Sequence, residues 1–150
     1  MTEELNKMQI DNLLLSQVVG RLGCRKGKIP YIVPVHYVYD GKYIIGQTNE
    51  GMKLNMIRKN PYVCFEVDVI TNMTDWESVI MHGTFHELKG KASREARAYL
   101  LNHVWPLSTR HTVHPHEHEA NEKIDDSHLI KSIMYRIKIK EKSGRSGKII

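Results

Sequence analysis

The chain has few cysteines, no long apolar run and no signal-peptide pattern, the features that are typical of small secreted or membrane-bound proteins. Only two of its 150 residues are cysteines, Cys24 and Cys64, and neither belongs to a metal-binding or redox motif. A disulfide between them is less expected than two buried, reduced thiols, because cytosolic proteins keep their cysteines reduced. No apolar run approaches the ~20 residues of a membrane-spanning helix. The N-terminal MTEELNKMQI is acidic and amphipathic, unlike a signal peptide. We therefore expect a cytoplasmic protein with no membrane partner.

The sequence also lacks the short motifs of several enzyme classes. It contains no nucleophile elbow, P-loop, zinc-deaminase signature or dinucleotide-binding glycine fingerprint. The formal charge is +5, but the basic residues at 26–28 and 138–148 lack the interleaved aromatic residues of single-strand binders. They also lack the basic helix of duplex binders. They are better interpreted as a solvated strand edge and tail, so we expect no nucleic-acid partner.

The remaining composition is that of one globular domain, over residues 1–150. Hydrophobic residues make up 41% and charged residues 26% of the chain, which is ordinary for a globular protein. Period-two alternation at hairpin spacing predicts a mainly β (α+β) fold, an antiparallel barrel of six strands with peripheral helices. The predicted strands are 18–24, 31–39, 42–48, 62–71, 76–88 and 131–140. The predicted helices are 2–16, 51–59 and 94–104, with Thr2 and Ser93 as N-caps of the first and last.

The stretch from residue 30 to residue 61 is the most informative. Two strand patterns meet at Asp40-Gly41, the dipeptide that a two-residue hairpin turn with two positive φ angles favours. The returning strand ends in polar residues and is followed by a glycine and Lys53 at the start of a short helix. A hydroxyl, amides and a lysine before a helix N-terminus suit an anionic group such as a phosphate. We interpret the methionines of this helix as core residues.

Five segments carry a resemblance to a known family. They are Gly20–Gly23, Pro30–Val35, Gly51–Leu54, Asn60–Val67 and Trp76–Ile80 with Gly83. In this order and spacing they resemble the FMN-binding split-barrel proteins of the pyridoxamine 5′-phosphate oxidase-like family, most of all its nitroimidazole-resistance branch. The resemblance implies a split barrel, noncovalently bound FMN, and a homodimer in which two protomers share each flavin.

The same resemblance assigns candidate binding residues. It implies that Thr48 and Lys53, with Gln47 and Asn49, contact the phosphate and ribityl chain of FMN. It places the flavin ring along Val33, Pro34, Val35 and His36. Pro34 fits such a place because a proline cannot donate to a sheet ladder and so marks an edge. Trp76 and Ser78 would reach the partner protomer's cofactor, although Trp76 also fits a core or dimer-interface position.

His36 is the candidate catalytic residue, since histidine is the usual proton donor near neutral pH. The alternative is that it only forms a hydrogen bond to the flavin or to a neighbouring strand. We expect an oxidoreductase acting on a small flat molecule such as a nitroaromatic. A pyridoxamine 5′-phosphate oxidase and a non-enzymatic flavin or haem binder are the alternatives. Gly46 stands where nitroimidazole-resistance proteins commonly carry a histidine, which speaks against that specific activity.

A histidine-rich stretch, His111 to His118, is the last candidate. His114, His116 and His118 alternate, so an extended backbone would present three imidazoles on one side, suitable for zinc or nickel. The spacing matches no established metal motif, however, and short histidine-rich tracts are only compositional evidence. We favour an unliganded loop and expect no metal site, with a lid over the substrate as a third option.

Overall fold

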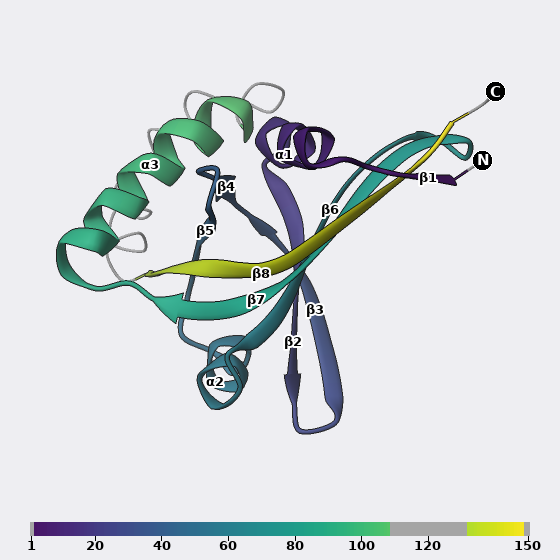
Figure 1. Cartoon of the computed structure of the whole chain (residues 1–150). Coiled ribbons are helices and arrows are strands. Elements are labelled where there is room, and N and C mark those ends of the chain that lie inside the picture. Colours follow the sequence, from purple (N-terminus) through teal and green to yellow (C-terminus); the bar gives the residue numbers. More distant parts are fainter. Residues whose placement is uncertain (1, 109–131, 149–150) are drawn as a thin grey trace.

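The described part of the chain forms one curled β-sheet with three helices around it. Figure 1 shows the computed structural model, which describes residues 2–108 and 132–148. Its elements in chain order are β1 (Thr2–Glu4), α1 (Lys7–Ser16), β2 (Val19–Lys26), β3 (Ile29–His36), β4 (Val38–Tyr39), β5 (Tyr43–Thr48), α2 (Met52–Lys59), β6 (Tyr62–Asn72), β7 (Asp75–Glu87), α3 (Gly90–Ser108) and β8 (Ile133–Gly147). The stretch His111–His118 lies outside the described residues.

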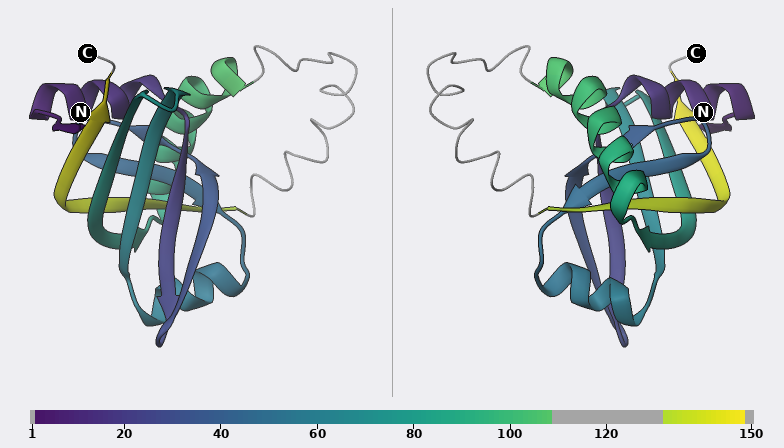
Figure 2. Two further views of the ribbon diagram at one scale, coloured as in Figure 1. Left: turned by 90° about the vertical axis from the view of Figure 1, so that its right-hand side faces the viewer. Right: turned by 90° about the vertical axis from the view of Figure 1, so that its left-hand side faces the viewer.

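The sheet is antiparallel and closes only in part. Its order is β3-β2-β6-β7-β8-β5-β4, and β1 adds to β8. The sheet curls until β3 contacts β5, which lies near the other end of this order (Figures 1 and 2). No strand pairing joins β3 to β5 within residues 2–108 and 132–148. The barrel is therefore split between these two strands, and the predicted α+β split-barrel fold is confirmed.

The sequence predicts six strands, and the described residues form eight. The predicted strand 31–39 divides at Tyr37 into β3, which pairs with β2, and β4, which pairs with β5. Tyr37 is fully buried, its backbone N–H donates to the Val18 carbonyl and its hydroxyl donates to the Leu14 carbonyl. These bonds fix the point where the chain leaves one partner strand for the other. The eighth strand, β1, is a three-residue addition at the edge of β8.

Both predicted helix caps are wrong. Thr2 does not begin a helix, because residues 2–4 pair with the end of β8. Asn6 caps α1 instead, its side chain accepting from the Gln9 N–H while Gln9 accepts from the Asn6 N–H. Helix α3 starts at Gly90, which adopts a positive φ of 62°, so Ser93 lies inside the helix.

The hairpin between β4 and β5 turns one residue later than the sequence predicts. The pairing of Tyr39 with Ile44 leaves Gly41 and Lys42 as the central residues, and only Gly41 has positive φ. The Asp40 side chain accepts hydrogen bonds from the N–H groups of Lys42 and Tyr43, at 2.8 and 2.6 Å. Asp40 therefore stabilises the turn from its first position rather than occupying its centre.

Two apolar clusters hold the sheet. The barrel core contains inward residues of the strands together with buried residues of α1 and α2. Helix α3 packs on the other side of β4, β5 and β8, against Val38, Ile45 and Met134. None of the described helices is long and apolar enough to cross a membrane.

The two cysteines are unpaired, as expected, but only Cys24 is buried, whereas Cys64 is partly exposed. Cys24 is buried in the barrel core. Cys64 lies opposite Gly23 in the pairing of β6 with β2. Because Gly23 is the residue before Cys24, the Cys64 side chain points to the face of the sheet opposite to that of Cys24. We call that face, on β3, β2, β6 and β7 and turned away from the core, the outer face.

Candidate functional site

A cleft of about 480 Å³ opens where the barrel is split. It lies between β3 on one side and the end of β5 with the start of α2 on the other. Its lining residues are Tyr31, Val33, Pro34, Val35, His36, Gln47, Thr48, Asn49, Gly51, Met52 and Lys53. Eight of the ten residues that the sequence analysis assigns to a cofactor are thus brought together, although they come from two strands, a helix and the loop before that helix.

The strand that forms one wall of the cleft, β3, is an edge strand of the sheet. β3 pairs only with β2, where Pro34 lies opposite Arg21. Val33 and Val35 point inward and pack against the core, while Pro34 and His36 are exposed on the outer face. Because no strand covers the other edge of β3 in the described chain, its backbone polar groups are available to a bound molecule.

The other end of the cleft is suited to an anion. Gly51 is the N-cap of α2 and provides no side-chain capping bond, so the first-turn N–H groups point outward without a side-chain acceptor. Lys53, in that first turn, is half-buried, and burial lowers the pKa of its ammonium. The buried Thr48 hydroxyl lies at the same end and makes one long bond, 3.3 Å, to the Asn49 carbonyl.

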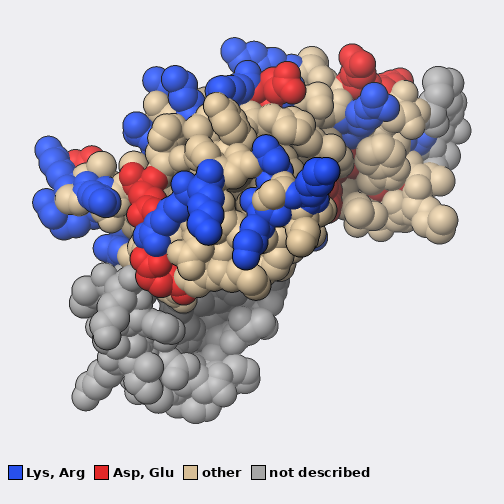
Figure 3. All heavy atoms as spheres, turned by 90° about the horizontal axis from the view of Figure 1, so that it is seen from below, with Lys and Arg blue, Asp and Glu red and all other residues tan. Residues whose placement is uncertain are grey.

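Lys53 forms no ion pair with the carboxylates of the described residues. The acidic residue nearest in sequence, Glu50, is bound instead by Arg58, which donates to its two oxygens at 2.9 Å each. Arg58 also pairs with Glu87 at 2.6 Å. A half-buried cation without a counter-charge is costly, so this end of the cleft favours a negatively charged ligand. Figure 3, seen from below, shows more Lys and Arg than Asp and Glu side chains on the underside of the molecule.

His36 stands at the end of β3 beside the cleft. It pairs in register with Val19 and its side chain is exposed on the outer face. No hydrogen bond or ion pair of its ring is found within the described part of the chain. The imidazole is therefore positioned by β3 and remains available to a ligand or to a second protein copy.

Trp76 and Ser78 do not line this cleft. They lie on β7, three strands away from β3 in the sheet, opposite Gly147 and Arg145 of β8. The Trp76 indole packs against Gly147, where an added Cβ would lie 2.4 Å from its ring nitrogen. Within one protomer these two residues cannot reach the cofactor cleft, so any contact would have to be with the cleft of a second copy.

Sequence reasoning missed Tyr31 and Met52. Met52, interpreted as a core residue, is 65% exposed and lines the cleft, whereas Met56 is buried as predicted. The available signal was its position as the first residue of α2, next to Lys53. For Tyr31 the available signal was the alternation of β3, because its side chain lies on the same inward side as Val33 and Val35, which line the cleft.

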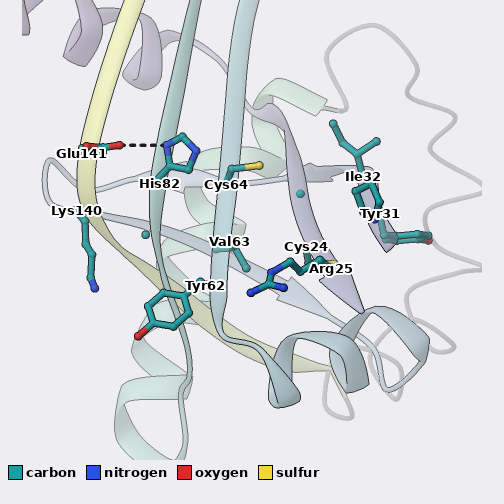
Figure 4. A pocket seen from close by; sticks show the side chains of 13 residues that line it. Cys24, Arg25, Tyr31, Ile32, Tyr62, Val63, Cys64, His82, Lys140 and Glu141 are labelled. Carbon is teal, nitrogen blue, oxygen red and sulfur yellow. Dashed lines mark ion pairs between the residues drawn. The ribbon is translucent and has the colours of Figure 1, made fainter. Parts of the chain in front are cut away.

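A second hollow of about 760 Å³ lies on the outer face (Figure 4). Cys64 and His82 are cross-strand neighbours there, which raises the question of a nucleophile and its base. Figure 4 shows the His82 ring turned toward Glu141, 3.6 Å away, while the Cys64 sulfur points toward β2. The thiol lies over Gly23, so the two side chains do not form a catalytic pair.

The comparisons with known proteins agree with the split-barrel fold. A family model described as pyridoxamine 5′-phosphate oxidase matches residues 6–146. The crystal structure of an FAD-binding protein from Mesorhizobium loti is 25% identical, with a TM-score of 0.77, covering 99% of this chain and 98% of its own. A proposed 5-nitroimidazole antibiotic resistance protein from Bacteroides thetaiotaomicron is 16% identical, with a TM-score of 0.70, covering 97% and 87%.

A curated relative, an uncharacterised protein of Rhizobium meliloti, is 26% identical over 84 residues, which is 56% of each chain. This chain thus spans only about half the length of that relative. The family model, in contrast, covers nearly the whole chain, from α1 to the end of β8. The chain therefore belongs to the pyridoxamine 5′-phosphate oxidase family.

Proposed function

We propose that the protein binds FMN in the cleft and acts as an oxidoreductase on a small flat molecule such as a nitroaromatic. The observation that carries this proposal is the half-buried Lys53, which has no carboxylate partner in the described chain and lies beside Thr48 at the open start of α2. An anion with hydrogen-bond acceptors satisfies the lysine, the hydroxyl and the helix N–H groups together. Family membership and the FAD-binding relative support a flavin as that anion.

We assign FMN rather than FAD to this cleft. One half-buried cation matches the single terminal phosphate of FMN, whereas FAD has a second phosphate and an adenosine that need further contacts. The ring would lie along the free edge of β3, from Val33 to His36, and the ribityl chain would pass Gln47 and Asn49. When bound, the flavin supplies the hydride and electron transfer, and the protein supplies position and electrostatics.

The chain's own residues then have separable roles. Lys53 and Thr48 hold the phosphate, and the inward-facing Val33 and Val35 give the ring an apolar wall. His36, exposed at the ring end of the cleft, is placed to donate a proton to a reduced substrate. Cofactor retention should therefore depend on the α2 end of the cleft, and turnover on the β3 end.

The proposed working form is a homodimer. Four aliphatic side chains of the outer face are exposed, a larger apolar surface than a single small barrel needs to leave open. They are Val19, Ile32, Ile70 and Ile80, at 39%, 69%, 69% and 46%. A second copy docked there would also bring Trp76 and Ser78 of its β7 within reach of a flavin. Light scattering at micromolar concentration with FMN present should give twice the protomer mass.

The test of the cofactor is a fluorescence titration with FMN and with FAD. Lys53→Ala should weaken FMN binding by about 1.5–3 kcal/mol, since a charge-assisted contact is lost. Lys59→Ala is the matched control, because Lys59 is an exposed lysine at the other end of α2. Equal FMN affinity in the two variants would remove the phosphate assignment, and tighter binding of FAD would reverse the choice of flavin.

The test of the reaction is single-turnover reoxidation of the reduced flavoprotein. Nitroimidazole and oxygen are added separately to the reduced protein. Pyridoxamine 5′-phosphate, the substrate that the description of the family model names, is added to the oxidised protein instead, because an amine gives electrons to the flavin. Faster reoxidation by nitroimidazole supports the proposal, flavin reduction by pyridoxamine 5′-phosphate supports the oxidase alternative, and neither reaction above the buffer rate supports a non-enzymatic binder. His36→Gln should slow the step about tenfold, equivalent to ~1.4 kcal/mol of barrier, at unchanged FMN affinity.

A further inference from the structure

The outer face of the sheet has no covering element in the described chain. The buried residues of α1 and α2 belong to the barrel core, and those of α3 pack on β4, β5 and β8. Figure 2 (left) shows β3, β2, β6 and β7 facing the viewer, with the helices above, below and behind them. The face combines the exposed apolar residues named above with one charged cluster at its centre, which is an unusual combination for a surface that stays in water.

The charged cluster contains more negative than positive charge. Arg21 on β2 lies opposite Glu66 on β6, and its Nη1 is 3.5 Å from Glu66 Oε1 and 3.1 Å from Asp68 Oδ2. Two carboxylates thus share one guanidinium. The Glu66 and Asp68 side chains are only 28% and 20% exposed in the single protomer. Covering this cluster would bury one negative charge per protomer that no ion pair among the described residues neutralises.

We propose that a second copy of the chain docks on the outer face and that Glu66 binds a proton when it does. The dimer then becomes tighter as the pH falls. This inference rests on the homodimer of the proposed function and adds its location and its regulation. A second copy is the occupant that we infer because its Trp76 and Ser78, which cannot reach the cleft of their own protomer, would lie beside Pro34 and His36, which belong both to this face and to the cleft. A dimer contact on this face therefore reaches the site.

The state of Glu66 in the single protomer agrees with the geometry. Burial, and then the neighbouring Asp68, raise the pKa of Glu66 to about 7, against the opposing effect of Arg21. Further burial by a second copy raises the pKa again. Above pH ~7 the dimer therefore holds protons that the separate protomers have lost. Above pH ~7 the dissociation constant of the dimer should rise by at most ~100-fold per pH unit, because two protons are bound per dimer. Below pH ~7 it should become independent of pH.

Other charged or titratable groups also face this surface, and the test has to separate them from Glu66. Besides Arg21 and Asp68 they are His36 on β3, Arg25 on β2, Tyr62 and Cys64 on β6, His82 on β7, and Lys140, Glu141 and Arg145 on β8. An arginine of the second copy that pairs with Glu66 would keep the carboxylate ionised. In that arrangement, removing the Glu66 charge weakens the dimer instead of strengthening it.

The experiment is sedimentation velocity over a dilution series at pH 6, 7 and 8.5, with FMN binding measured on the same samples. The full-length protein should dissociate at least ~10-fold more readily at pH 8.5 than at pH 6. Glu66→Gln should abolish this dependence and be the tighter dimer at pH 8.5. Glu95→Gln, which removes an exposed carboxylate on α3, and His82→Gln should both keep the dependence.

The location is tested by Ile32→Asn and Ile80→Asn, which should weaken the dimer at least ~10-fold at every pH. The proposal is overturned if the protein is monomeric throughout, if the isoleucine variants dimerise normally, or if Glu66→Gln keeps the pH dependence or weakens the dimer at pH 8.5. Loss of the proton effect with FMN binding intact overturns this inference alone. A pH-dependent dimer that binds no flavin overturns only the cofactor proposal.

Discussion

The cleft and the outer face each contain one half-buried charge that the fold leaves unbalanced, and the two charges have opposite signs. Lys53 in the cleft has no carboxylate among the described residues, and Glu66 on the outer face shares Arg21 with Asp68. Charged side chains with a purely structural role have partners of opposite charge within the protomer. Lys142, for example, donates to Asp11 at 2.8 Å and to the Tyr39 hydroxyl at 3.2 Å, joining α1 to the sheet. A partly buried charge without a balancing partner therefore indicates a binding site for another molecule.

The two regions also differ in the space around one glycine of each, Gly46 beneath the cleft and Gly23 on the outer face. Of all the substitutions, Gly46→Ala should have the largest effect on the free energy of unfolding. A Cβ at residue 46 would lie 2.4 Å from Tyr135 Oη and 2.6 Å from its Cζ. The Tyr135 ring is fully buried and stacked on Phe85, with centroids 4.5 Å apart, so it cannot yield. We expect a loss of about 2–3 kcal/mol in urea-unfolding free energy.

The matched control is Gly23→Ala on the outer face. There the added Cβ would meet Cys64 Sγ at 2.5 Å, which is the free end of a side chain that can rotate. The expected loss is under ~1 kcal/mol. Equal losses in the two variants would mean that the strand beneath the cleft is no more tightly fixed than the outer face.

Arg21→Gln should have the next largest effect, because it leaves Glu66 and Asp68 side by side without a cation. We expect a loss of about 1–2 kcal/mol at pH 8, where Glu66 is ionised. The loss should be smaller at pH 5, where the raised pKa of Glu66 keeps that group protonated. Arg145→Gln, on the same face but with an exposed side chain, serves as the control in urea unfolding at both pH values.

Lys53→Met tests the other half of the comparison. It keeps the aliphatic stem and removes a charge that burial already disfavours. The ligand-free protein should therefore gain ~0.5–1 kcal/mol of stability while FMN affinity falls, two effects of opposite sign. Thermal unfolding without flavin, with Lys59→Met beside it, measures the first effect. A loss of stability in Lys53→Met alone would show that the lysine has a structural partner.

Glu66→Gln should have the smallest effect on stability, and its sign depends on pH. The pKa of Glu66 is raised to about 7 from 4.5, so the folded protomer binds more protons than the unfolded chain between these values. Stability should therefore fall as pH rises from 4.5 to 7, and Glu66→Gln should remove that fall. We expect a gain under ~1 kcal/mol at pH 8, since solvent screens a partly exposed carboxylate. Measuring Tm at pH 5 and pH 8 in the Ile32→Asn background limits any contribution from dimerisation.

Local pattern was enough to predict most of the strands and the anion end of the cleft. Alternation identified inward residues such as Val63, Phe65 and Val67, which are buried, because a strand with one solvated face has a strict period of two. The polar run before α2 located the cleft because the residues of its anion end are neighbours in sequence. The resemblance added β3 as the opposite wall, which no local pattern connects to residues 47–53.

Features that depend on distant pairing were not predictable. Thr2 looked like a helix cap because nothing local shows that β8 continues to Gly147 and pairs with residues 2–4. Tyr37 looked like one more strand residue because the change of partner strand depends on α1. The Glu66 cluster was missed for the same reason, since Arg21 and Glu66 are 45 positions apart by their numbers and meet only when β2 and β6 pair.

The length of β8 has a consequence for the order in which the molecule can be made. Its first half pairs with β5, from Thr48 opposite Ile133 to Tyr43 opposite Lys138, and its far end pairs with β1. While a ribosome is still adding residues 49–132, β5 has only the two-residue β4 as its partner. One wall of the cofactor cleft therefore cannot be fixed until the last described strand emerges, and contacts of such long sequence separation form slowly. Nascent chains that stall before residue 133 should expose the edges of β5 and β7, aggregate readily and retain no flavin.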